Sequence, residues 1–386
     1  MTYQLGQGQG PLAGTKIVEL AGIGPSPHAC MILADLGADV IRVDRPGGGT
    51  LGGGKFDFLT RGRPSVAIDI KHPDGVETIL RLCEGADVLI EGMRPGAAER
   101  LGVGPEQVHA RNPRLVYGRM TGWGQTGPLA QVAGHDMNYV SLTGALYGLG
   151  QDPARPHFPS NLLGDFGGGS TYLVIGILAA LLHARSTGEG QVIDAAIVDG
   201  TAHVNAMGAA LLAAGLASER RRSGLLDGGM PFYDLYETAD GRHMSVGPLE
   251  PQFWAEFCRL LPLPDDAPDR GDLARSEELR TIIADRFRTR TMAEWTEAFE
   301  GTEACVAPVL TVAEAAVHPH MAAREVFVER DGALQPAPAP RFSRTTTSLT
   351  TGPTRPGQNS TTALADWGID DVESLIESGA VVQVDA

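Results

Sequence analysis

The fold of this chain is decided between residues 17 and 44, which read IVELAGIGPSPHACMILADLGADVIRVD. Residues 17–20 and 40–44 are short, mostly apolar runs of the kind that form buried strands. Between them, a turn containing Gly22 and Gly24 precedes a mostly apolar helix that we predict over residues 28–36. A strand, a helix and a second strand in this order predict a βαβ unit with two parallel strands.

This βαβ unit partly matches the glycine fingerprint of dinucleotide-binding proteins. Gly22, Gly24 and the acidic Asp44 fit the pattern, but Pro27 stands where the third glycine is expected. A partial fingerprint is weak evidence for nicotinamide or flavin binding. A Rossmann-like half whose glycines serve its own packing explains the segment more simply.

Strands and helices continue to alternate after this unit. We predict strands at residues 65–71, 87–91 and 114–120, with helices around 75–83 and 105–111. The alternation favours a parallel sheet with helices on its faces, and ligands of such sheets bind beyond the carboxyl ends of the strands. Surface basic residues are usually only solvated, but Arg45, Lys71 and Arg94 all fall at or just past such an end. Together they indicate an anion site at this edge of the sheet.

The sequence changes character after residue 200 and predicts a second domain. An Asp240-Gly241 turn between two strand-like runs predicts a β-hairpin, which amphipathic helices follow. The predicted fold class is therefore α/β, a Rossmann-like parallel sheet in a large domain with a smaller α+β domain. The predicted boundaries are 1–200 for the large domain, with 338–386 returning to it, 201–227 for a linker, 228–320 for the small domain and 321–337 for a second linker. The Pro-Ala alternation of residues 335–340 is typical of an extended connector.

Composition limits the kinds of partner and compartment. The 386 residues carry a formal net charge of −16, with a pI of about 5.0, which argues against nucleic acid or an anionic membrane as the main partner. The apolar run at residues 172–183 is too short to span a bilayer, so we expect a buried helix there. The four cysteines are widely spaced, so we expect neither a metal site nor a disulfide framework. Residues 1–10 lack the pattern of a signal peptide, and the protein is predicted to be cytoplasmic.

Two glycine-rich segments carry titratable side chains suited to proton transfer. His135 lies in Gly134-His135-Asp136, and Asp165 is followed by three glycines, 167–169, where we predict the start of a long helix. An imidazole titrates near neutrality, and a partly shielded carboxyl can be raised toward the same range. Facing one carbon, the two groups would move a proton across it, and the amides of residues 167–169 would be placed to stabilise an enolate oxygen.

Structural roles explain the same residues when each is taken alone. Asp165 before a predicted helix is typical of an N-cap, and Glu250, followed by a proline, would also suit a helix cap. His135 and Asp136 would suit a satisfied buried pair. Asn161, four residues before Asp165, is placed to hydrogen-bond to it. Both interpretations stay open on the residues alone.

Several motifs resemble those of the family III CoA-transferase superfamily. They are residues 18–25, 33–40, 69–71, 94–96, 120–128 and 188–191. Within the superfamily, His135 and the segment Glu250-Pro251-Gln252-Phe253 resemble the bacterial α-methylacyl-CoA racemases. Transferases of the superfamily usually hold an aromatic or another non-basic residue at the position of His135. In them, the aspartate that matches Asp165 is the nucleophile.

The resemblance implies a racemase/epimerase that interconverts (R)- and (S)-2-methylacyl-CoA thioesters by 1,1-proton transfer through an enolate. His135 and Asp165 would exchange the roles of base and acid, oriented by Glu250 and Asn161 respectively. The alternative is an acyl-CoA:carboxylate CoA-transferase with Asp165 as nucleophile. Neither a cofactor nor a metal is implied, because CoA is part of the substrate and the thioester acidifies the α-proton.

The resemblance also implies the binding residues and the oligomeric state. The residues that would line the CoA site are Arg45, Asp69, Ile70, Lys71, Glu91, Gly92, Arg94, Arg100 and Tyr139. The expected assembly is an interlocked homodimer. The loop from Gly47 to Gly54 is unlike that of the racemases, and the physiological acyl group is not indicated.

Overall fold

The computed structural model describes residues 5–49 and 54–384, so part of the Gly47 to Gly54 loop lies outside the described residues. The chain divides into two compact units. The first comprises residues 1–143, 159–204 and 323–386, and the second comprises residues 144–158 and 205–322.

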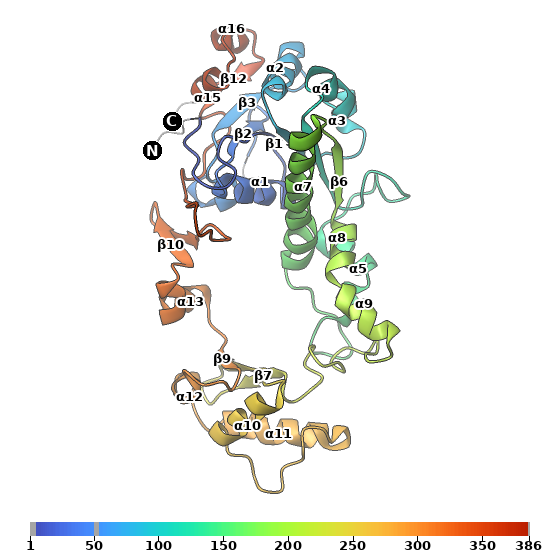
Figure 1. Ribbon diagram of the computed structural model, residues 1–386, viewed down its shortest axis with the longest axis vertical. Helices are drawn as coiled ribbons and strands as arrows, with labels where there is room; N and C mark the ends of the chain where they lie inside the picture. The colour runs from blue at the N-terminus through green and yellow to red at the C-terminus, as the bar shows by residue number, and fades with distance from the viewer. Residues whose placement is uncertain (1–4, 50–53, 385–386) are drawn as a thin grey trace. The chain divides into compact units, whose positions relative to one another are not determined.

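The first unit is built on a seven-stranded sheet with the strand order β12-β3-β2-β1-β4-β5-β6 (Figure 1). The strands are β1 (Lys16–Leu20), β2 (Asp39–Asp44), β3 (Ser65–Ile68), β4 (Val88–Glu91), β5 (Val116–Thr121), β6 (Val192–Ala196) and β12 (Val381–Val382). The first six run parallel, and β12 pairs antiparallel with β3 at the edge. The predicted Rossmann-like fold is confirmed, and the strand order reverses between β1 and β4, where such sheets bind ligands.

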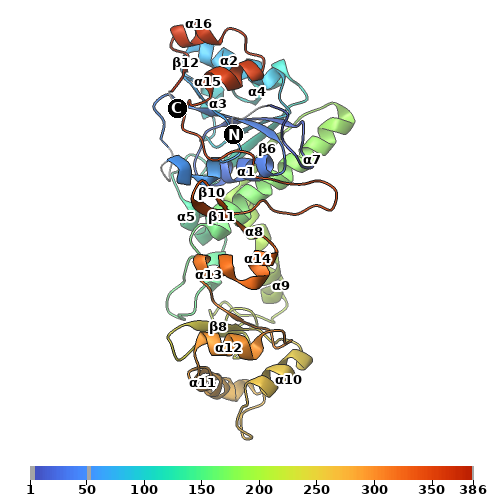
Figure 2. The same cartoon turned by 90° about the vertical axis from the view of Figure 1, so that its left-hand side faces the viewer.

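Helices cover both faces of this sheet, as parallel sheets require. Its helices are α1 (Pro25–Asp35), α2 (Pro73–Glu84), α3 (Ala97–Arg100), α4 (Pro105–Arg111), α5 (Asp136–Leu142), α7 (Thr171–Thr187), α8 (Ile197–Val204), α15 (Ser360–Asp366) and α16 (Val372–Glu377), with short 3₁₀ turns at Gly54–Phe56 and Phe58–Thr60. Figures 1 and 2 show α2, α4, α15 and α16 on one face and α1 and α7 on the other. Val18 of β1 packs against the side that carries α2 and α4, and its neighbour Ile17 packs against the side that carries α1 and α7. Successive side chains of a strand point to opposite faces of the sheet.

The long helix begins earlier than the sequence predicts. A π-helix, η3, runs over Leu162–Ser170 and leads directly into α7. Asp165 therefore lies in the first turn of a helix instead of before it. The apolar run at residues 172–183 lies within the continuous Leu162–Thr187 helix, which as a whole is long and apolar enough by length and composition to cross a membrane. One side of α7, including Leu173 and Ile177, is packed in the core of the first unit, which is how a core helix passes the same test.

The second unit is the predicted α+β domain. A three-stranded antiparallel sheet has the order β7-β8-β9. Its elements are α6 (Ala145–Gly148), α9 (Ala206–Ala213), β7 (Asp234–Glu237), β8 (His243–Val246), α10 (Pro251–Leu260), a 3₁₀ turn at Leu273–Arg275, α11 (Ser276–Phe287), α12 (Met292–Phe299), β9 (Val306–Pro308), α13 (Val312–Val317) and α14 (Pro319–Ala323). Its core is aromatic, with Tyr236 stacked on Phe287 and Phe257 stacked on Phe299.

Two stretches differ from the predicted organisation. The predicted connector at residues 335–340 begins inside a hairpin formed by β10 (Phe327–Arg330) and β11 (Ala333–Pro336). Its turn residues Asp331 and Gly332 both have positive φ, as a two-residue hairpin turn requires. Residues 144–158, which we included in the large domain, fall in the second unit, where the Arg221 guanidinium donates to the carbonyls of Tyr147 and Pro153, both at 2.7 Å.

We predict that Gly168→Ala lowers the free energy of unfolding by about 1–3 kcal/mol, the usual cost of overpacking. A Cβ atom on Gly168 would lie 2.3 Å from Oγ1 and 2.5 Å from the backbone nitrogen of Thr201 on α8, and the backbone cannot yield cheaply. Denaturant unfolding measures the change. Gly85→Ala is the control, because a Cβ atom there meets nothing within 4 Å. Equal stability of the two variants would contradict the close approach of η3 and α8.

Candidate active site

His135 stands immediately before α5. Its backbone is extended, and its N–H donates to Oδ1 of Asn138 at 3.1 Å, which fixes the entry into the helix. The side chain is exposed, whereas that of Asp136 is buried. The two residues therefore do not form the buried pair of the structural interpretation.

Asp165 is half-buried in the first turn of η3. Its Oδ2 accepts a hydrogen bond from Nδ2 of Asn161 at 3.2 Å, so the structure contains the contact that we predicted between these residues. Asn161, not Asp165, occupies the N-cap position, which rules out a capping role for Asp165. The turn at Gly24 also approaches this carboxylate, because a Cβ atom on Gly24 would lie 3.1 Å from Oδ2.

The segments of His135 and Asp165 are joined by Asp136. Oδ1 of Asp136 accepts the backbone N–H of Asp165 at 2.7 Å. The structure thus brings the His135 segment and the start of η3 together, as the sequence interpretation requires.

The surroundings of Asp165 favour the protonated form of its carboxyl more than water does around a solvated aspartate. Burial raises the pKa of Asp165 above its ordinary value, and the charge of Asp136 raises it further, while the hydrogen bond from Asn161 and the charge of His135 lower it. The balance is upward. A carboxyl in this position is suited to give up a proton nearer neutrality than a solvated aspartate would.

The predicted role of the glycine amides is wrong. Residues 167–169 lie inside η3, where N–H groups bond to the carbonyl five residues earlier, as Phe166 does to Asn161 at 3.3 Å. Gly168 and Gly169 are buried. Their lack of side chains permits close packing and does not open an oxyanion site.

Glu250 belongs to the second unit. It precedes α10, and its side chain is exposed and makes no capping hydrogen bond to that helix. The capping interpretation therefore fails for Glu250. Its predicted orientation of His135 stays a prediction.

A cavity of about 310 Å³ lies at the carboxyl ends of β1 to β4. Its lining includes Gly22, Ile23, Arg45, Ile70 and Met93, so two of the predicted ligand contacts meet here. A neighbouring cavity of about 210 Å³ shares Gly22 and Ile23 and continues to Gly24, the residue that faces Asp165. The glycine turn after β1 thus connects the ligand edge of the sheet with the carboxylate.

The other predicted ligand contacts have different surroundings. Lys71, Gly92, Arg94 and Arg100 are exposed, and Asp69 accepts the N–H of Lys71 at 2.9 Å. Glu91 is fully buried, and both oxygens of its carboxylate are hydrogen-bonded. Oε1 accepts from Arg119 at 3.0 Å, and Oε2 accepts from the N–H of Met93 at 2.5 Å. Burial raises the pKa of Glu91. Its carboxylate shapes the turn that carries Arg94 and is not offered to a ligand.

Tyr139 packs within the His135 segment. Its hydroxyl donates to the carbonyl of Gly134, and its ring meets Trp123 edge-on at 4.7 Å between centroids. Gly122 is required here, because a Cβ atom on it would lie 2.0 Å from the Tyr139 ring. Burial and the charge of Asp165 raise the pKa of Tyr139, while Arg94 lowers it. The Tyr139 hydroxyl is therefore under the electrostatic influence of both the Asp165 carboxylate and the predicted ligand contact Arg94.

His28 was missed by the sequence interpretation. Its ring packs on Phe166 at 4.3 Å between centroids, and Nδ1 hydrogen-bonds to Oγ of Ser170 at 2.6 Å. Burial, with the charges of Arg61 and Arg63, lowers the pKa of His28 to about 4, so it is neutral at pH 7. It braces the helix that carries Asp165. A histidine in the first turn of an apolar helix was the only signal in the sequence.

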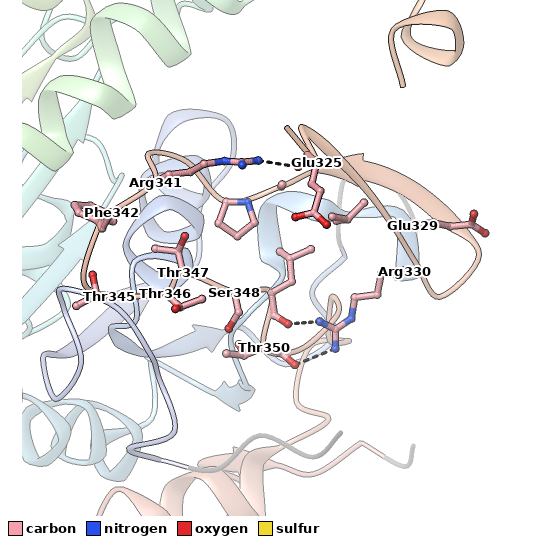
Figure 3. Close-up of a pocket in the computed structure, with 14 residues that line it drawn as sticks. Glu325, Glu329, Arg330, Arg341, Phe342, Thr345, Thr346, Thr347, Ser348 and Thr350 are labelled. Carbon is pink, nitrogen blue, oxygen red and sulfur yellow. Dashed lines mark hydrogen bonds between the residues drawn. The ribbon is translucent and has the colours of Figure 1, made fainter. Parts of the chain in front are cut away.

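A wider cavity, of about 620 Å³, lies between the β10–β11 hairpin and residues 345–350 (Figure 3). The Arg330 guanidinium donates to the carbonyls of Leu349 and Thr350, at 2.5 and 2.9 Å. Threonine hydroxyls line much of the remaining wall. None of its lining residues is a predicted site residue, so the cavity is separate from the site around Asp165.

Both the sequence and the fold of this chain are similar to those of known proteins. Residues 12–360 match the model of the family described as CoA-transferase family III. The chain is 42% identical over 379 residues to the alpha-methylacyl-CoA racemase of Mus musculus, covering 97% of this chain and 98% of the mouse protein. It is also 30% identical over 398 residues to the succinyl-CoA:glutarate CoA-transferase of Homo sapiens, covering 97% of this chain and 90% of the human protein. A solved CAIB/BAIF family protein from Brucella suis superposes with a TM-score of 0.81 at 27% identity, covering 93% of this chain and 100% of that chain.

We predict that Asp165→Asn stabilises the protein at neutral pH. Burial raises the pKa of Asp165 in the folded state, so the cost of its charge appears only as the pH rises through that pKa. The thermal midpoint of Asp165→Asn should exceed that of the wild type at pH 7, and the gain should vanish below about pH 4, where aspartates are protonated.

Thermal unfolding between pH 3 and pH 8 measures this effect. The control is Asp87→Asn, which alters a carboxylate that accepts the N–H of Lys16 at 2.8 Å at the opposite edge of the sheet and should give no gain at pH 7. A lower midpoint for Asp165→Asn than for the wild type at pH 7 would contradict the electrostatic description.

Proposed function

This chain belongs to CoA-transferase family III, and from that premise we propose that it is a racemase of 2-methylacyl-CoA thioesters. The enzyme would interconvert the (R) and (S) epimers at the α-carbon. The observation that carries the proposal is the position of His135 on the segment that hydrogen-bonds to the backbone of Asp165. Two proton-transfer groups of different chemistry at one site suit epimerisation, whereas CoA transfer needs only a carboxylate nucleophile.

The proposed reaction balances without any external reagent. In one direction, neutral His135 removes the α-proton, and the electron pair of the C–H bond moves into the thioester carbonyl to form an enolate. Protonated Asp165 then delivers its proton to the opposite face of the carbon. The raised pKa of Asp165 supports this role, because the acid must hold its proton near neutrality. In the other direction the two residues exchange roles.

The remaining predicted residues have supporting roles in this proposal. Asn161 would orient Asp165 through the 3.2 Å hydrogen bond, and Glu250 would orient His135. The exposed basic residues Arg45, Lys71, Arg94 and Arg100 would bind the phosphates of CoA at the carboxyl edge of the sheet. We propose no cofactor, because CoA belongs to the substrate and its thioester acidifies the proton that moves.

A CoA-transferase is the second candidate function. The observation that favours it is the carboxylate of Asp165, which is partly exposed and held by a hydrogen bond from Asn161. Such a carboxylate is equally suited to attack an acyl-CoA carbonyl. The similarity to a protein named succinyl-CoA:glutarate CoA-transferase keeps this alternative open.

A homodimer is also part of the proposal. The outward face of α7 carries Ile175, Ala179 and Leu182, all exposed. All residues of α9 are apolar or glycine, yet none is buried. A helix that is apolar all round requires cover, and a second copy of this chain would supply it. The free cysteines, of which Cys30 and Cys83 are buried, are compatible with the expected cytoplasmic location.

We predict that the wild-type protein, incubated with one epimer of a 2-methylacyl-CoA in D₂O, produces both epimers with deuterium at the α-carbon. His135→Gln and Asp165→Asn should each reduce interconversion by about 10²-fold or more, the usual range for acid–base groups. Mass spectrometry and chiral chromatography give the two readouts. Movement of CoA to an added free carboxylate without α-exchange would overturn the racemase proposal in favour of the transferase.

The dimer leads to a separate prediction. Leu182→Glu places a charge in the proposed interface and should weaken self-association by about tenfold or more, as for a buried interface residue. Light scattering across a concentration series measures the mass. Leu273→Glu, at another exposed leucine (67% exposed), is the control. A wild-type protein that is monomeric at micromolar concentration would refute the proposed assembly.

A further inference from the structure

The geometry points to Asp136 as a positioning residue that sets where His135 and Asp165 stand relative to each other. The inference rests on the proposed function and deepens it, because it names a residue that acts through the two proton-transfer groups. Asp136 directly follows His135 in the chain, and its Oδ1 accepts the backbone N–H of Asp165 at 2.7 Å. One carboxylate thus connects the two segments.

The contact is buried and short. Asp136 is 9% exposed, so water competes weakly for its oxygen atoms. Its carboxylate also accepts the backbone N–H of Gly164. Both N–H groups belong to the first turn of η3, where a helix has no carbonyl of its own to receive them. Hydrogen bonds to an ionised acceptor are about twice as strong as neutral ones, so Asp136 holds the start of η3 firmly.

The residues around Asp136 pack closely about its hydrogen bond to the backbone of Asp165. A Cβ atom on Gly164 would lie 2.2 Å from Oδ1 of Asp136 and 2.8 Å from Cγ2 of Val140. Glycine at residue 164 is therefore what allows the carboxylate to reach the backbone of Asp165. Any larger residue would displace Asp136 or the first turn of η3.

The consequence concerns the rate more than the binding of substrate. Asp136 is directed at the backbone of residues 164 and 165 and not at the cavity that contains Arg45 and Ile70. Loss of its carboxylate would let Asp165 move relative to His135 while leaving the proposed CoA contacts in place. A displacement of about 1 Å at a reacting group costs on the order of 10²-fold in rate.

The test compares Asp136→Ala with Asp136→Asn in the full-length protein. Asp136→Ala should lower kcat for α-proton exchange by about 10²-fold, with KM changed by less than about threefold. Asp136→Asn keeps an oxygen acceptor for the N–H of Asp165 and should recover at least tenfold of that loss. All rates are expressed per folded protein, measured by circular dichroism.

The matched control is Asp87→Ala. Asp87 also accepts a backbone N–H, from Lys16 at 2.8 Å, but at the amino edge of the sheet. The Asp87→Ala variant should be less stable than the wild type, whereas its kcat should be unchanged. If Asp136→Ala loses only stability, as Asp87→Ala does, or if Asp136→Asn recovers nothing, the positioning role is overturned.

The wild-type protein separates failure of this inference from failure of the proposed function. If the wild type exchanges the α-proton and Asp136→Ala keeps full kcat, only the inference about Asp136 fails. If the wild type transfers CoA without exchanging the α-proton, the racemase proposal fails. The rate of CoA transfer then tests the positioning role of Asp136 in place of the exchange rate. A 10²-fold loss of transfer in Asp136→Ala would then support the positioning of Asp165, and an unchanged transfer rate would overturn it.

Discussion

One hydrogen bond, from the backbone N–H of Asp165 to the carboxylate of Asp136, holds together the part of the structure on which the site depends. It caps the start of η3, and η3 leads into α7, which packs against the sheet. Because Asp136 follows His135, the same bond fixes the histidine segment against the helix. The first turn of η3 is thereby joined both to the core of the first unit and to the histidine segment.

This arrangement places the carboxylate of Asp165 where its negative charge lowers the stability of the fold. Burial and the nearby carboxylate of Asp136 both raise the pKa of Asp165, so ionised Asp165 costs the folded protein stability at neutral pH. Functional sites commonly carry such costs. His28, neutral and packed on Phe166, braces the same helix from α1 without adding charge. The site therefore combines an unfavourable carboxylate with a rigid surround.

Much of the first unit follows from the sequence, because strands of a parallel sheet are apolar on both faces and their helices begin at recognisable turns. The start of η3 does not follow, since Asp136 caps it from a distant segment and no local pattern records that contact. The β10–β11 hairpin was not predicted, because the Pro-rich run was interpreted as a connector and the Asp331-Gly332 turn before it was overlooked. The pairing of Asn161 with Asp165 was predictable from their spacing. The burial of Glu91 was not, because it depends on Arg119 from another strand.

In the proposed reaction two different bases serve opposite faces of one carbon, and variants that keep only one of the two bases test this arrangement most directly. In D₂O, Asp165→Asn should still exchange the α-proton of the epimer that presents it to His135, without converting it to the other epimer. His135→Gln should exchange only the opposite epimer. This reciprocal, epimer-specific exchange is the predicted result. A variant that exchanges the α-proton of both epimers would contradict a two-base site at His135 and Asp165. So would the finding that neither variant exchanges either epimer.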